Sequence, residues 1–224
     1  MSAWTAAWAL ACGPRQGSSV AEPLTPRGRQ IVQAARQLLE QGGAQALTMR
    51  RLADRLGIRA PSLYKHLPDK AALEAAIIAT GLEDIAAAVE TALKTAPDAD
   101  AAPLAALAGA YRAFALAHPH LYRLMTDQPL PRDHLPAGVE ARAAAPLLQA
   151  AGNQDLARAV WAFAHGMVQL ELAQRFPPGV DLDTAWQEGI TAFQAHMTTH
   201  DHDHHAAEPP VASHPQAADP ADPS

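Results

Sequence analysis

The feature that most constrains the fold of this chain is a pair of short helical segments near its start, each ended by a residue that breaks helices. Apolar side chains recur at helical spacing in residues 48–56, behind a threonine suited to cap the first turn, and Gly57 follows where a left-handed backbone is tolerated. A second short helix is expected from Pro61 to Leu67, where another proline ends it. Two short helices joined by a short glycine-containing turn are typical of a helix-turn-helix.

Longer helices are predicted on both sides of this pair. Pro26, in the first turn behind a capping threonine, opens a helix that two glycines end at Gly42. Asp69 is a good cap for a further helix that runs to about Lys94. We expect the first helix to support the pair, so residues 26–72 are predicted to form a three-helix helix-turn-helix domain.

Composition favours helices in the rest of the chain as well. Alanine, which has the highest intrinsic helix propensity, supplies much of the 49% hydrophobic content, while aromatic residues make up only 5%. An all-α fold is therefore predicted, with residues 73–197 as a second helical domain. Its later helices are expected at 102–118, 137–151, 153–175 and 181–197, with a short turn at 120–126.

The two ends of the chain differ from this helical body. Residues 1–25 contain a short apolar run, but no Lys or Arg precedes it as an export signal requires. These residues are predicted to be a disordered extension. Residues 198–224 are predicted to be a disordered tail rich in His, Pro, Ala and Asp, because large apolar side chains are scarce there. The single cysteine, Cys12, fits a reducing cytosol, and no segment downstream approaches the ~18 apolar residues of a membrane span. A cytoplasmic protein with no membrane contact is expected.

Charge is divided unevenly along the chain. Residues 26–73 hold nine Lys or Arg against three acidic residues, a balance of +6, whereas residues 74–224 hold seven against nineteen, a balance of −12. A basic block ahead of an acidic body indicates that the front of the chain contacts a polyanion and that the rest does not. For a helix-turn-helix that polyanion is double-stranded DNA, whose major groove receives the second short helix.

The stretch ALTMRRLADRLGIRAPSLYKHLPDKAAL resembles the DNA-binding region of the TetR family of bacterial repressors, and especially its tetracycline-repressor branch. The resemblance is carried by Thr48, Ala53, the Leu-Gly-Ile turn at 56–58, the Pro-Ser-Leu-Tyr run at 61–64, and His66 followed by Lys70. The later segment WAFAHGMVQLELAQRFPPGVDLDTAWQEG resembles the C-terminal domain of a subgroup with a Trp-His-Gly signature, here Trp161, His165 and Gly166. The resemblance implies a homodimeric repressor that a small-molecule effector releases from a palindromic operator, with residues 73–197 as the ligand-binding and dimerisation domain.

The resemblance also implies two kinds of DNA contact, since phosphate contacts supply affinity and base contacts supply sequence preference. Phosphate contacts are expected from Thr48, Tyr64, His66 and Lys70. Base contacts are expected from Arg50, Ala60, Pro61, Ser62 and Lys65. The tetracycline repressors have a longer amide side chain at the position of Ala60, so their operator does not carry over to this chain. General positive charge is expected from Arg51, Arg55 and Arg59.

Eight large or polar-tipped side chains of the second domain are predicted to line a cavity between helices. They are Tyr111, Phe114, His118, Tyr122, Met125, Trp161, His165 and Met167. Because Arg112 and Arg123 are the only cations nearby, we expect an apolar or aromatic effector. The apolar stripes of the last two helices are predicted to form the homodimer interface, with an intrachain core as the alternative for some of them. These stripes comprise Leu156, Val160, Phe163, Leu170, Leu182, Trp186, Ile190 and Phe193.

Other functions stay open at this point. Ala60 also fits a small-molecule-binding or interaction protein whose operator recognition has degenerated. A metal-responsive regulator would use the tail histidines, although no cysteine accompanies them and no metal site is assigned. Those histidines are His196, His200, His202, His204 and His205. No Gly-rich phosphate loop or nucleophile elbow is present, so neither enzyme activity nor a cofactor is expected.

Overall fold

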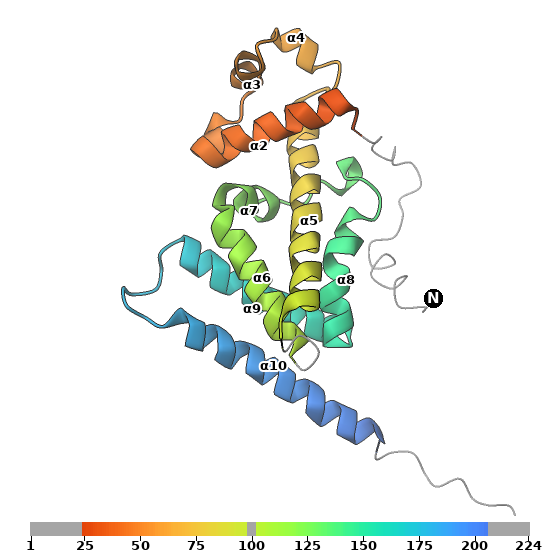
Figure 1. The fold of residues 1–224 in the computed structure, drawn as a ribbon, viewed down its shortest axis with the longest axis vertical. Coiled ribbons are helices and arrows are strands. Elements are labelled where there is room, and N and C mark those ends of the chain that lie inside the picture. Colours follow the sequence, from red (N-terminus) through yellow and green to blue (C-terminus); the bar gives the residue numbers. More distant parts are fainter. Residues whose placement is uncertain (1–23, 98–101, 206–224) are drawn as a thin grey trace, which may run out of the picture.

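The computed structural model describes residues 24–97 and 102–205 of the chain, and within them every regular element is a helix (Figure 1). The predicted all-α fold is confirmed. Apart from Leu24 and Thr25, the predicted N-terminal extension lies outside the described residues, as do residues 206–224 of the predicted tail. The elements are α2 (Pro26–Ala46), α3 (Met49–Leu56), α4 (Ala60–Leu63), α5 (Lys70–Thr95), α6 (Pro103–Ala117), α7 (Pro119–Thr126), the 3₁₀ helix η1 (Arg132–His134), α8 (Val139–Ala151), α9 (Gln154–Leu172) and α10 (Leu182–His205).

Helices α2 and α3 begin and end largely where local chemistry predicts. The Thr25 hydroxyl accepts a hydrogen bond from the Gly28 N–H at 3.0 Å and caps α2. At the other end of α2, Gly42 leaves helical geometry and Gly43 has a φ of 68°, so the glycine pair breaks the helix as expected. Gly57 ends α3 in the left-handed conformation with a φ of 64°.

The recognition element is shorter than the sequence predicts. α4 ends at Leu63 and residues 64–66 continue as a turn, whereas a helix up to Leu67 was expected. The Leu67 N–H still reaches the Leu63 carbonyl at 3.0 Å, but Pro68 has no N–H to continue the helix and restricts the residue before it. The element therefore presents a single helical turn followed by a hydrogen-bonded turn.

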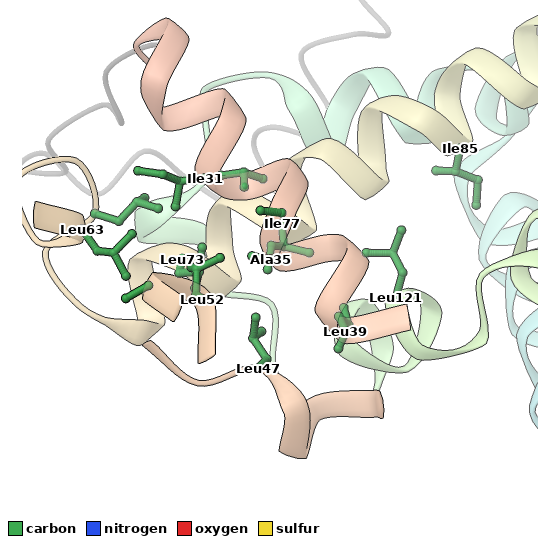
Figure 2. Packing of buried hydrophobic residues seen from close by; sticks show 14 of the residues in the cluster. Ile31, Ala35, Leu39, Leu47, Leu52, Leu63, Leu73, Ile77, Ile85 and Leu121 are labelled. Carbon is green, nitrogen blue, oxygen red and sulfur yellow. The ribbon is translucent and has the colours of Figure 1, made fainter. Parts of the chain in front are cut away.

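A hydrophobic core holds these short helices to α2 and to the start of α5 (Figure 2). Ile31 and Leu39 of α2 meet Leu52 of α3 and Leu63 of α4, and all four side chains are fully buried. Each such side chain stabilises the fold by about 1.5–3 kcal/mol relative to an exposed position. The core also includes Leu121, which comes from far along the chain, so the helix-turn-helix unit is completed by α7.

α5 is the central spine of the molecule (Figure 1). Asp69 caps it by accepting a hydrogen bond from the Ala72 N–H at 2.7 Å, as predicted. It packs against α2 and α7 near the helix-turn-helix end and against α6 and α8 farther down. A second core, which includes Val89, Leu104 and Val160, joins the lower half of α5 to α6, α9 and α10.

α7 is the element that the sequence missed. A short turn was expected at 120–126, but Pro119–Thr126 form an eight-residue helix. Pro119 at its first position favours a helix start, but no side chain caps the first turn. Packing stabilises the helix, since Leu121 and Tyr122 are 0% and 1% exposed. Leu121 lies in the helix-turn-helix core, and Tyr122 lies in the second core.

Two glycines mark close approaches between helices. A Cβ on Gly81 of α5 would lie 2.6 Å from the Met125 sulfur of α7, and a Cβ on Gly189 of α10 would overlap the Phe163 ring of α9. A side chain at Gly81 would require Met125 to shift, and one at Gly189 would require the Phe163 ring to move. No helix in the described residues combines the length and the apolar character needed to cross a bilayer.

Candidate DNA-binding surface and ligand-sensing cluster

The residues predicted to contact DNA gather on α3 and its cap, on α4 and the turn after it, and at the first residue of α5, at one end of the molecule (Figure 1). Nearly all of them are exposed, and Tyr64 is 49% exposed despite its size. The exposed set is Thr48, Arg50, Pro61, Tyr64, Lys65, His66 and Lys70, while Ala60 and Ser62 are half-buried. Such a surface of cations and hydroxyls around one exposed aromatic ring suits a phosphate backbone.

Two of these residues also have structural partners. The Thr48 hydroxyl accepts a hydrogen bond from the Arg51 N–H at 3.2 Å and so caps α3. The Lys70 ammonium pairs with the Glu74 carboxylate one turn later at 3.2 Å. Because the Lys70 side chain is 52% exposed, this pair is weak and leaves the cation accessible to a phosphate.

Four of the eight predicted ligand-site residues come together between α6, α7 and α9. The Tyr111 and Tyr122 hydroxyls are 2.8 Å apart, and the Tyr122 hydroxyl lies 2.7 Å from Nδ1 of His165. The His165 ring stacks on Trp161 with centroids 5.8 Å apart, and Trp161 is 50% exposed. We call Tyr111, Tyr122, Trp161 and His165 the sensing cluster; it runs from the buried core out to the surface.

Burial sets the protonation of this cluster. Desolvation raises the pKa of both tyrosines, for Tyr122 with a further contribution from Tyr111, so both phenols stay neutral. Desolvation lowers the pKa of His165, and the nearby Asp127 carboxylate only partly opposes it. The two phenols and a neutral imidazole thus form one hydrogen-bonded chain, whose direction follows the tautomer of His165.

The other four predicted ligand residues lie elsewhere. Phe114 is 7% exposed and packs against the ring of His118 at a centroid distance of 5.2 Å. His118 lines a groove of about 570 Å³ that runs along α2 and includes Arg36 and Thr80. Met125 lies against α5, and Met167 borders the second core. Four of the eight predicted cavity residues therefore form the sensing cluster, and the other four lie at separate places in the fold.

The predicted dimer-interface residues lie mostly inside the single chain. Leu156, Val160, Trp186 and Ile190 are at most 8% exposed and belong to the second core. The half-buried residues Phe163, Leu182 and Phe193 pack against that core, and Leu170 is 41% exposed. The apolar stripes thus first join α9 and α10 to α6 within one protomer.

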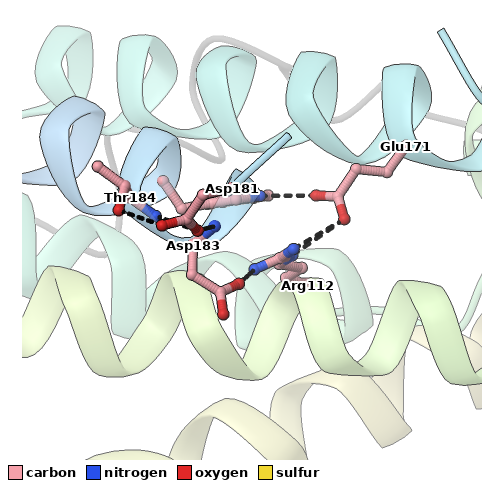
Figure 3. A network of polar contacts seen from close by, with 6 residues as sticks. Arg112, Glu171, Asp181, Asp183 and Thr184 are labelled. Atoms are coloured by element: carbon pink, nitrogen blue, oxygen red, sulfur yellow. Dashed lines mark hydrogen bonds and ion pairs between the residues drawn. The ribbon is translucent and has the colours of Figure 1, made fainter. Parts of the chain in front are cut away.

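A polar network that sequence reasoning missed ties α6, α9 and α10 together (Figure 3). Arg112 of α6 donates from Nη2 to a Glu171 oxygen at 2.9 Å and from Nη1 to Asp183 at 2.6 Å. The other Glu171 oxygen accepts from the Trp186 indole N–H at 2.6 Å, and the guanidinium also lies over the Trp186 ring at 5.5 Å. These residues are far apart in the sequence, so their pairing could not be predicted from it.

Within the part of the chain whose side chains are described, no three His, Cys, Asp or Glu side chains gather as a metal site. Of the tail histidines, only His196 lies in that part, so the structure leaves the metal alternative untested.

Comparisons with known proteins match both halves of the chain. Residues 31–77 match the family model of bacterial regulatory proteins of the tetR family, and residues 104–193 match the model of the tetracyclin repressor-like C-terminal domain. An uncharacterized HTH-type transcriptional regulator from Mycobacterium tuberculosis is 31% identical over 202 residues, covering 84% of this chain and 91% of that protein.

Solved structures show the same fold. A possible TetR family transcriptional regulator from Streptomyces coelicolor A3(2) aligns with a TM-score of 0.52 and 25% identity over 77% of this chain and 93% of that one. A TetR variant from Acinetobacter baumannii AYE, in complex with minocycline, aligns with a TM-score of 0.55 and 25% identity over 79% of this chain and 98% of that one.

Proposed function

The chain belongs to the TetR family of transcriptional regulators, and from that membership we propose that it is a repressor released from a palindromic operator by a small-molecule effector. The family is not enzymatic, which confirms the expectation of no catalytic activity. As a regulator it acts where the DNA is, so we propose a cytoplasmic protein.

The observation that carries this proposal is the placement of two adjacent residues of α7. Leu121 is buried in the core of the helix-turn-helix unit, while Tyr122 is buried in the sensing cluster. The α7 backbone is also tied to α2, because the Leu121 N–H donates to the Glu40 carboxylate at 3.2 Å. A shift of α7 caused by a ligand at Tyr122 therefore displaces a core residue of the DNA-binding unit.

The energetic requirement for such control is modest. A ligand changes DNA affinity only as far as it binds one conformation of the protein better than the other. Coupling free energies between two sites are typically about 1–3 kcal/mol. Loss or rearrangement of the hydrogen bonds that join Tyr111, Tyr122 and His165 lies in this range, since each is worth about 0.5–1.5 kcal/mol.

The sensing cluster favours an aromatic effector with a hydrogen-bonding group. Trp161 and His165 offer stacking faces, and neutral phenols and a neutral imidazole offer hydrogen bonds without a net charge. The related TetR variant in complex with minocycline supports the same class, since minocycline is a tetracyclic compound with one aromatic ring and several polar substituents.

We place the homodimer interface on the outer faces of α9 and α10, because most of the predicted interface residues are buried within the protomer. Ala162 and Leu170 of α9, with Ala185 and Ala192 of α10, are exposed, and three of the four are small enough for close helix packing. A two-fold dimer presents two α4 elements to successive major grooves, ~34–36 Å apart. Leu170→Arg is expected to turn the dimer into a monomer in size-exclusion chromatography with light scattering, whereas Leu116→Arg, at an exposed position of α6, is expected to leave it dimeric.

Footprinting of the full chain across the DNA upstream of its own gene tests the proposal, with minocycline as the first effector probe and a panel of other polycyclic compounds after it. We expect a short protected palindrome that one of these compounds releases. Weak, sequence-indifferent binding that modest salt removes would support the alternative of a binding protein with degenerate operator recognition.

A further inference from the structure

Ala60 stands at a position predicted to contact a base, but its side chain has no hydrogen-bonding group. The side chain is half-buried and packs against the helix-turn-helix core, and a methyl group makes no hydrogen bond in any case. A neighbouring residue with hydrogen-bond donors can supply a polar contact beside Ala60, in addition to those expected from Arg50, Ser62 and Lys65, because sequence is read through hydrogen bonds to base edges.

Arg55, one of the cations near α4, is already engaged inside the protein. Its guanidinium donates to the side-chain oxygens of Gln37 at 2.8 Å and Gln41 at 3.2 Å, both on α2. This pair of bonds joins α3 to α2 and occupies both terminal nitrogens of the guanidinium. Arg55 is therefore a structural residue and a useful control.

Arg59 is placed differently. It stands directly before Ala60 in the turn between α3 and α4, with an extended backbone (φ −79°, ψ 141°), and its side chain is exposed. Its backbone carbonyl accepts the Ser62 N–H at 2.9 Å, which holds the turn in register with α4. In the described part of the chain no carboxylate pairs with its guanidinium. The position thus combines a fixed backbone with an uncommitted five-donor side chain.

We propose that Arg59 reads a base in each operator half-site, and that this base is a guanine. A guanidinium donates two parallel hydrogen bonds to O6 and N7 of guanine in the major groove, the commonest specific contact in protein–DNA complexes. Arg59 then takes over the readout that Ala60 cannot perform. This assignment rests on the proposed function, since it presupposes a DNA operator.

The test is binding-site selection from a random duplex pool with the full-length protein, its Arg59→Ala and Arg59→Gln variants, and Arg55→Ala as the matched control. Wild type is expected to select a palindrome with a guanine in each half-site that Arg59→Ala no longer prefers. Affinity for the wild-type site is expected to fall about ten- to hundredfold in Arg59→Ala. Arg59→Gln is expected to move the preference at that position towards adenine, which an amide recognises at N6 and N7. Arg55→Ala is expected to select the wild-type sequence.

Two results would overturn the assignment. One is an Arg59→Ala variant that selects the wild-type palindrome with affinity unchanged. The other is one whose affinity falls equally for all duplexes while the salt dependence decreases by about one counterion, which is the behaviour of a phosphate contact. If wild type selects no sequence at all, the proposed operator-binding function fails and the assignment falls with it. Circular dichroism and thermal unfolding of each variant confirm that the exposed substitutions leave the fold intact.

Discussion

The indole N–H of Trp186 donates to one oxygen of Glu171 at 2.6 Å while Arg112 binds the other, so a single carboxylate holds the start of α10 to the end of α9 and to α6. The Glu171 side chain is 8% exposed, which makes these bonds hard for water to replace. The pair of helices α9 and α10, to which we assign dimerisation, is thus held in place by the Glu171 carboxylate.

Glu171→Ala is expected to lower the free energy of unfolding by about 2–3 kcal/mol, because it leaves the Arg112 charge and the Trp186 N–H without their partner. Chemical denaturation measures the effect. Asp183→Asn is the control: Asp183 also binds Arg112, but its side chain is 83% exposed, so a loss below about 0.5 kcal/mol is expected. Equal losses in the two variants would contradict a special role for Glu171.

Tyr122→Phe is expected to cost about 1–2 kcal/mol of unfolding free energy, since it removes the hydroxyl that joins Tyr111 to His165 and leaves two polar atoms without that bond. Tyr111→Phe removes the Tyr111 hydroxyl's hydrogen bonds to Tyr122 and to Trp161, and it is expected to cost less because Trp161 is 50% exposed and water can replace its partner. Denaturation curves of the two variants measure the two losses in unfolding free energy. A larger loss in Tyr111→Phe would show that Tyr122 is not the central member of these hydrogen bonds.

The stability of the protein is expected to fall in mild acid through His165. Its folded pKa lies below the ordinary value of 6.5, so below that pH the unfolded chain takes up a proton that the folded protein resists. The free energy of unfolding therefore decreases as pH drops from about 6.5 to the folded pKa and then levels off. Denaturation of wild type and His165→Gln between about pH 5 and 8 tests this. The difference between them should change only in the acid range, and a constant difference would refute the assignment.

Gly189→Ala is expected to destabilise the protein by about 1–3 kcal/mol, because the new methyl overlaps the Phe163 ring and pushes α10 away from α9. Gly109→Ala is the matched control. No atom lies within 4 Å of a Cβ at Gly109 in α6, so a gain of up to about 1 kcal/mol from helix propensity is expected there. Thermal unfolding distinguishes the expected loss of stability in Gly189→Ala from the expected gain in Gly109→Ala. Similar changes in melting temperature in the two variants would contradict a close crossing of α9 and α10.

Lys70→Ala is expected to reduce the slope of log K against log salt by about one, as the loss of one phosphate contact does. Its ion pair with Glu74 is exposed, so the stability of the protein should hardly change. Lys94→Ala, at the far end of α5, should leave the slope unchanged. Fluorescence anisotropy at several salt concentrations gives both slopes, and identical slopes would remove Lys70 from the DNA surface.

Sequence reasoning succeeded where structure depends on neighbours along the chain. The Thr25 and Asp69 caps each bind a backbone N–H three residues away, and Gly57 needs only its own freedom to adopt a left-handed backbone. The helix of α7 was missed because its stability comes from the burial of Leu121 and Tyr122 against distant elements, which local signals do not carry.

The candidate sites show the same division. Eight residues were predicted to line one cavity, and four of them, Tyr111, Tyr122, Trp161 and His165, lie together. The other four do not, because helical spacing alone does not distinguish a cavity lining from a core. The sequence could not tell whether the apolar stripe of α10 faces its own chain or a second copy, because apolar side chains suit both environments. The partners of Arg112 were likewise invisible until α6, α9 and α10 were placed.

Gly81 determines how closely α7 packs against α5. Met125 and Leu121 of α7 both approach the position where a Cβ would stand, at 2.6 and 3.2 Å, so α7 lies against the one glycine of α5. A larger residue at position 81 would have to displace these two side chains. It would thereby disturb the helix that carries both Tyr122 and a core residue of the helix-turn-helix unit.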